Sequence, residues 1–208
     1  MKDHRHFYDA LTHVAWGYVL LHLNINLGTL NILPDWAGYL LLLSALPVLG
    51  EEEPSAPLLK PLGQLLALWK GVLWVLALLG RSLSLPLAEL VAGVVELYFH
   101  FQLLTNLAEL ARRFPPPPEE PSYLPGTEPD HPPKPPAPLH RRLLRLRTAR
   151  TLLTTLLFLP LPQALLSWEP FSWLLILAHL IVALKLLFAL FELRRAFPEP
   201  REEDGACV

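Results

Sequence analysis

Ionisable side chains inside apolar stretches are the residues of this 208-residue chain that could do chemistry. A charge in apolar surroundings is costly, so such a residue suggests a site. Glu89, Glu96 and His100 occupy one face of a predicted helix, because their spacing matches the helical repeat. Glu96 and His100 are one turn apart, close enough to share a hydrogen bond or a proton. We expect Lys185, in the last apolar stretch, to be the cation that partners Glu96.

A second polar cluster is predicted nearer the cytoplasmic end of the same helix. Gln102 and Asn106 form a stripe on the side opposite Glu96. Lys70 lies in the preceding apolar stretch, and its side chain should lean toward the cytoplasm because side chains tilt toward the start of their helix. We therefore expect Lys70 to contact Gln102 or Asn106 rather than Glu96.

Two interpretations of these polar residues remain open. They either hold helices together, where such contacts average about 0.6 kcal/mol, or they form part of a proton or ion pathway. No HExxH, GxGxxG, phosphate-binding loop or GxSxG motif occurs, and the single cysteine is Cys207. We therefore predict no catalytic residue, no metal site and no cofactor, and we do not expect an enzyme.

The composition indicates a membrane protein. The chain is 52% hydrophobic and 17% charged, against about 25% charged residues in soluble domains, and its mean hydropathy is +0.36. The predicted fold is an all-α integral membrane helical bundle of about six transmembrane helices. The expected spans lie near residues 10–33, 36–49, 62–79, 85–111, 151–166 and 172–193. The second run has the length of a re-entrant segment as well as that of a short span.

The positive charges favour six spans with the N- and C-termini in the cytoplasm. This topology leaves 14 of the 17 lysines and arginines on the cytoplasmic side, where positive charge is retained. The chain then divides into a membrane region (1–111), a cytoplasmic loop (112–150), a membrane hairpin (151–193) and a cytoplasmic tail (194–208).

The 112–150 loop has two parts. Residues 115–138 contain 12 of the 23 prolines and predict an extended spacer, with a docking motif for a protein partner as the alternative. The following stretch is rich in arginine and should contact anionic lipid headgroups rather than nucleic acid. Its basic residues are Arg141, Arg142, Arg145, Arg147 and Arg150.

One motif joins the first two predicted spans. Residues 32–39 read ILPDWAGY, within the stretch LGTLNILPDWAGYLL at 27–41. This stretch resembles the start of uncharacterised multi-pass membrane proteins of Gram-positive, Clostridium-like bacteria. The resemblance covers about the first 50 residues, and the proline-rich loop departs from that pattern. It implies a location in the bacterial plasma (inner) membrane and assigns no catalytic residue.

These observations lead to two functional expectations. The first is a small component of the bacterial plasma membrane that binds a partner or supports assembly, with structural polar residues. The alternative is a small transporter or proton-coupled permease that uses the polar residues of the fourth and sixth spans.

Overall fold

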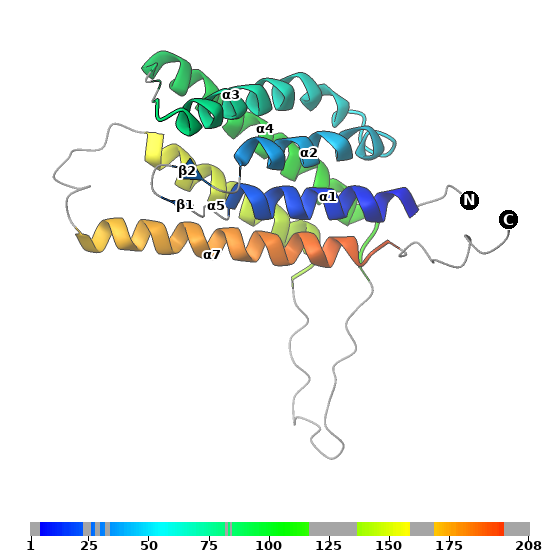
Figure 1. Cartoon of the computed structure of the whole chain (residues 1–208). Helices are drawn as coiled ribbons and strands as arrows, with labels where there is room; N and C mark the ends of the chain where they lie inside the picture. Colours follow the sequence, from blue (N-terminus) through cyan, green and yellow to red (C-terminus); the bar gives the residue numbers. More distant parts are fainter. Residues whose placement is uncertain are drawn as a thin grey trace, which may run out of the picture.

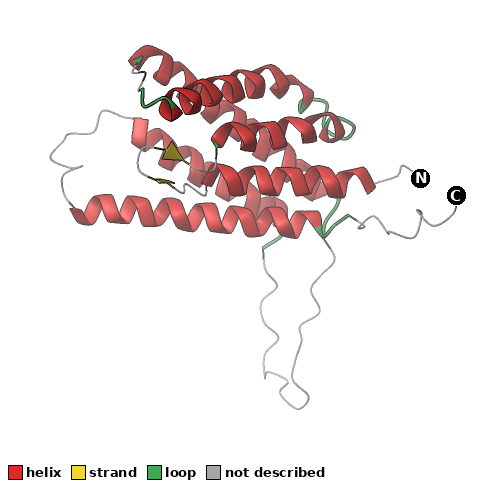
Figure 2. Cartoon of the chain, in the orientation of Figure 1, coloured by secondary structure: helices red, strands yellow, loops and turns green. Residues whose placement is uncertain are grey.

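The computed structural model describes residues 5–22, 26–27, 30–31, 34–81, 83, 85–116, 137–158 and 169–197. These residues form a bundle of six α-helices, as predicted, with one very short pair of strands (Figures 1 and 2). The helices are α1 (Arg5–His22), α2 (Asp35–Leu49), α3 (Lys60–Leu78), α4 (Pro86–Arg113), α5 (Leu139–Phe158) and α7 (Glu169–Arg194). A 3-10 turn, η1 (Pro57–Leu59), precedes α3, and β1 (Asn26–Leu27) pairs antiparallel with β2 (Leu30–Asn31).

The helices form a closed ring. Going around it, α1 packs against α2, α2 against α3, α3 against α4, α4 against α5, α5 against α7, and α7 against α1. The start of α1 and the end of α7 lie at the same end of the bundle, on the right in Figure 1. The core includes large side chains with no exposed surface, among them Tyr18, Tyr39 and Phe99.

Three of the described helices are long and apolar enough to cross a membrane: Pro57–Leu78, Pro86–Arg113 and Glu169–Arg194. Helix α2 is apolar but has only 15 residues, a length of about 22 Å against a hydrocarbon core of about 30 Å. The protein is therefore a helical, membrane-associated protein by length and composition. The segments predicted at 36–49, 62–79, 85–111 and 172–193 correspond to α2, α3, α4 and α7.

The first predicted span is wrong in its second half. Helix α1 ends at His22 within the described residues, and the β1–β2 pair occupies part of the remainder of 10–33. Asparagine side chains bond to nearby backbone groups and so favour turns over helix, and Asn26 and Asn31 face each other in this pair. Helix α1 also carries Asp9 and His13, and it is not among the helices apolar enough to span.

The predicted loop 112–150 is wrong at its C-terminal side. Helix α5 begins at Leu139, directly after Pro138, so the arginine-rich stretch is helical. Leucine and arginine are both strong helix formers, and proline is tolerated at a helix start. Residues 151–158 of the predicted span 151–166 therefore form the second half of α5, and residues 159–166 lie outside the described part. The proline-rich residues 117–136 and the tail from 198 onward also lie outside it.

Two glycines allow α1 and α2 to approach closely. A Cβ atom added at Gly17 would lie 3.0 Å from the carbonyl oxygen of Gly38, and one added at Gly38 would lie 2.9 Å from the carbonyl oxygen of Gly17. Small residues at such crossings bring helix backbones together in membrane bundles. This contact fixes the distance between the two helices that carry Tyr18 and Tyr39.

Candidate functional site

A polar cavity of about 280 Å³ lies between α1, α4, α5 and α7. Its leucines and Phe101 form the apolar part of the wall, while polar side chains from all four helices form the rest. These polar residues are His22, Glu96, His100, Arg147, Arg150, Thr151, Thr154 and His179. Helix α5 contributes the most of them, because positions 147, 150, 151 and 154 share one face of a helix.

The two arginines of the cavity are held by aromatic rings and a hydroxyl group. Nη1 of Arg147 donates a hydrogen bond to Oγ1 of Thr105 (2.9 Å), and its guanidinium lies 4.2 Å from the centre of the Phe101 ring. The Arg150 guanidinium lies 5.2 Å from the centre of the Tyr18 ring. Among the residues that the structure describes, neither arginine has a carboxylate within ion-pair distance. Their positive charges are therefore not compensated by direct ion pairs there.

Three buried nitrogen atoms at the cavity lack a hydrogen-bond partner within the described ranges. They are Nε of Arg147, Nη1 of Arg150 and Nδ1 of His179. Buried polar atoms are normally satisfied, and each one that is not needs an explanation. All three belong to residues that line this cavity, and two of these residues are cations, so an anion is the ligand that its wall favours.

His100 lies at the centre of a tyrosine pair. Its Nδ1 is 3.0 Å from the Tyr18 hydroxyl and its Nε2 is 3.3 Å from the Tyr39 hydroxyl. In a neutral imidazole one nitrogen donates and the other accepts, so two hydroxyl groups satisfy the ring completely. The expected hydrogen bond to Glu96 is not found between these described side chains, and His100 links α4 to α1 and α2 instead.

The partner of Glu96 differs from the prediction. Nζ of Lys70 lies 3.2 Å from a Glu96 carboxylate oxygen and 3.7 Å from an Asp35 carboxylate oxygen. Lys70 therefore bridges α2, α3 and α4. Lys185 is exposed on α7, which packs against α1 and α5 rather than α4. The prediction that Lys185 pairs with Glu96 is wrong because pairing depends on which helices are neighbours, and α4 has α3 beside it.

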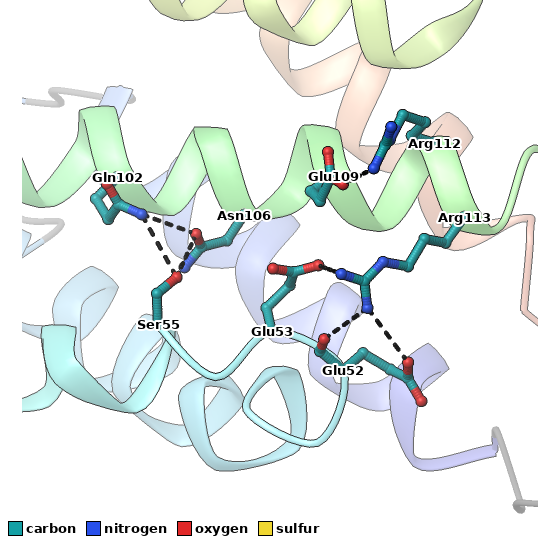
Figure 3. A network of polar contacts seen from close by, with 8 residues as sticks. All are labelled: Glu52, Glu53, Ser55, Gln102, Asn106, Glu109, Arg112 and Arg113. Carbon is teal, nitrogen blue, oxygen red and sulfur yellow. Dashed lines mark hydrogen bonds and ion pairs between the residues drawn. The ribbon is translucent and has the colours of Figure 1, made fainter.

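The second polar cluster forms without Lys70 (Figure 3). The Ser55 hydroxyl donates to Oδ1 of Asn106 (2.8 Å), and Nε2 of Gln102 donates to the same oxygen (3.0 Å). Ser55, in the segment between α2 and α3, takes the place expected for Lys70. The cluster attaches this segment to α4, and it lies apart from the lining of the cavity.

Arg113 strengthens the same attachment (Figure 3). Its Nη1 donates to the carbonyl oxygen of Glu52 (2.8 Å), and its Nη2 lies 2.9 Å from a Glu53 carboxylate oxygen. Arg112 pairs with Glu109 one turn earlier on α4. These contacts place a cation beside Glu52 and Glu53, two of the three successive glutamates at this end of the bundle.

The remaining predicted residues lie outside the cavity. Glu89 is exposed in the first turn of α4. Arg141 and Arg145 are exposed on α5, and their contact with lipid headgroups stays a prediction. Arg142 pairs with Glu192 of α7 (2.6 Å), and the two cavity arginines contact aromatic rings of the bundle. For these three residues, too, contact with lipid headgroups stays a prediction.

The sequence interpretation missed the cavity-facing role of Arg147 and Arg150. The signal was available in their spacing, because Arg147, Arg150 and Thr154 follow a helical repeat once residues 139–158 are taken as one helix. Within the described ranges, no three His, Cys, Asp or Glu side chains are grouped in a way that could hold a metal ion.

Comparison with protein-family models, curated proteins and solved structures gives no match. The resemblance of residues 27–41 to Gram-positive membrane proteins therefore stays a prediction.

Proposed function

We propose that this protein is a small proton-coupled permease of the bacterial plasma membrane, with six membrane-crossing helices and both termini in the cytoplasm. The three helices apolar enough to span, and the common end at which α1 starts and α7 finishes, support this topology. Arg112 and Arg113 lie in the last turn of α4, and Arg194 lies in the last turn of α7; these are two of the three inward-running helices of the proposed topology. Retention of positive charge in the cytoplasm then orients the bundle.

The observation that carries the proposal is the 280 Å³ cavity with Arg147 and Arg150 in its wall. Charged residues of membrane proteins face the bundle interior or a water-filled cavity, and they mark the paths of solutes and protons. The position of the arginines also explains why α5 belongs to the bundle although it is not apolar. Two of its five arginines, Arg147 and Arg150, line the cavity, and a third, Arg142, pairs with Glu192 of α7.

Glu96 is the proton carrier in this proposal. Glu96 lines the cavity, where a solute would bind, and its carboxylate contacts the positively charged Lys70. Protonation of Glu96 would weaken its attraction to Lys70 and leave Asp35 as that cation's remaining carboxylate partner. Lys70 would thus exchange its contact with Glu96 of α4 for its contact with Asp35 of α2. In this way the uptake of a proton by Glu96 is coupled to a change in helix packing.

The test measures proton entry into liposomes that contain the purified protein, with a pH-sensitive dye and an imposed membrane potential. We expect wild-type flux above that of protein-free liposomes and loss of this flux in Glu96→Gln. Glu89→Gln is the matched control, because it makes the same change on an exposed position of the same helix. Flux equal to that of protein-free liposomes, or flux unchanged in Glu96→Gln, would contradict the proposal.

One observation favours the second candidate, a partner-binding or assembly component. Lys185 is exposed near the middle of α7, beside Leu184 (46% exposed) and Phe188 (70% exposed). A lysine facing lipid at this depth is costly, whereas an acidic residue of a neighbouring protein would stabilise it. This candidate predicts a complex larger than the monomer in native gels of solubilised membranes, lost in Lys185→Leu and kept in Lys60→Leu.

A joint substitution separates the two candidates. A purely structural ion pair tolerates replacement of both partners by neutral residues, while breaking one side alone is destabilising. Because Lys70 also pairs with Asp35, the joint variant replaces all three charges, Asp35→Asn, Lys70→Met and Glu96→Gln, and it should fold under both candidates. Only the permease proposal requires this folded variant to lose proton flux.

A further inference from the structure

Resting on the proposed function, we infer that the cavity is a binding site for a phosphate group, held mainly by Arg150 and Arg147. The site would accept a small phosphate ester or the phosphate of an anionic lipid. The side chains of the cavity wall would bind the phosphate group of either molecule in the same way. The argument rests on charge, on the set of donors and on the size of the cavity.

Charge comes first. The two guanidinium groups of the wall are always charged, and Glu96 is its single carboxylate. That carboxylate and Asp35 share the cation of Lys70, at 3.2 Å and 3.7 Å, so this group of three has one net negative charge against the two positive charges of the arginines. The arginines therefore leave the site with an excess of positive charge, and burial makes an uncompensated charge expensive.

The donors come from more than one helix. Arg147 and Arg150 on α5 and His179 on α7 line the cavity, and each of them carries a buried nitrogen without a partner within the described ranges. Thr154 adds a hydroxyl group to the same wall. A carboxylate has two oxygens in one plane, whereas a phosphate offers three or four in a tetrahedron. Donors that approach from different helices therefore suit a phosphate, and arginine is the usual residue for binding it.

The cavity also has room for part of a larger molecule. A volume of 280 Å³ corresponds to roughly nine water molecules at about 30 Å³ each, more than one phosphate group fills. Leu21, Leu97 and Leu157 line the cavity together with the polar side chains. An organic group attached to the phosphate can therefore lie against these apolar side chains.

The experiment measures binding to the full-length protein purified in a phosphate-free detergent. Isothermal titration uses two probes, inorganic phosphate and dioctanoyl phosphatidic acid, with sodium acetate as the competitor. We expect at least one phosphate probe to bind and Arg150→Gln to weaken it at least tenfold. Arg145→Gln, the same change on an exposed position of α5, should bind like the wild type. Binding of phosphatidic acid alone identifies a lipid source, and binding of inorganic phosphate identifies a soluble one.

A second variant guards against misfolding, because Arg150 also packs on Tyr18. Thr154→Val keeps the shape of the side chain and removes only its hydroxyl group, so it should weaken phosphate binding with no change in helical circular dichroism. Absence of binding by the wild type overturns the inference. So does equal binding by the wild type, Arg150→Gln and Thr154→Val, or displacement by acetate at equal concentration.

The outcomes for this site and for the permease proposal are distinct. Proton flux that depends on Glu96, without phosphate binding, would leave the permease standing and refute the phosphate site. Phosphate binding that depends on Arg150, without proton flux, would leave the phosphate site standing and refute the permease.

Discussion

The Tyr18 hydroxyl lies 3.0 Å from Nδ1 of His100, although 82 positions separate the two residues in the sequence. Tyr39 contacts the other nitrogen of the same ring from α2. One imidazole thus joins three helices, and it does so at the edge of the polar cavity. The contact gives His100 a positioning role, since both of its nitrogens are already engaged.

Removal of either hydroxyl should loosen this junction. We expect Tyr18→Phe and Tyr39→Phe each to reduce the free energy of unfolding by about 1 kcal/mol, the usual net value of a hydrogen bond. Because both hydroxyls bond one ring, the double variant should deviate from the sum by more than about 0.5 kcal/mol. Unfolding of the detergent-solubilised protein by sodium dodecyl sulfate measures these differences. Tyr98→Phe is the control, since Tyr98 is exposed on α4, and an equal loss in this variant would refute the role of the junction.

The crossing of α1 and α2 should be sensitive to a single methyl group. Gly38→Ala places a Cβ 2.9 Å from the carbonyl oxygen of Gly17, so one backbone must move away from the other. We expect a loss of about 1–3 kcal/mol, the usual cost of overpacking, seen as a lower melting temperature by circular dichroism. Gly71→Ala is the matched control, because its nearest neighbour is 3.9 Å away, in Trp36. That variant should be neutral or more stable, since alanine favours a helix by up to about 1 kcal/mol.

Stability should depend on pH through Glu53, which lies in the segment between α2 and α3. Burial raises the pKa of its carboxyl above the ordinary value of 4.5, although the Arg113 guanidinium beside it acts in the opposite direction. The folded protein therefore binds this proton more tightly than the unfolded chain does. Stability from this group is present at low pH and is lost as the pH rises through the raised pKa.

The variant Glu53→Gln tests this dependence. It has no charge to bury, so its gain in melting temperature over the wild type should be largest near pH 7.5 and should shrink toward pH 4.5. Glu51→Gln, an exposed neighbour, should show no such trend. A difference between Glu53→Gln and the wild type that stays constant, or grows on acidification, would contradict the raised pKa.

Helix positions were predictable where the sequence carries local signals. Pro34 precedes α2, Pro86 opens α4, and apolar runs fill both helices, so their ends fall within two residues of the prediction. The second half of the first predicted span failed for a local reason as well, because asparagines interrupt its apolar run. The start of α5 was missed because its arginines were interpreted as a charged loop, although their side chains also favour a helix.

The identity of the polar residues in the bundle was available from the sequence, but their partners were not. Spacing along one helix places Glu96 and His100 on a face; it does not say which helix that face meets. The ring of six helices puts α3 beside α4, and so Lys70 rather than Lys185 reaches Glu96. The same ring places Arg147 and Arg150 of α5 against aromatic rings of α4 and α1.

The sequence by itself determined an all-helical, apolar chain with costly ionisable groups in its helices, because hydrophobic content and periodicity are local properties. Only the tertiary structure decided that these groups enclose a cavity and that its arginines lack a carboxylate partner among the described residues. The physical reason is that helix adjacency depends on the packing of the whole bundle, as at Gly17 and Gly38, and no stretch of sequence contains it alone.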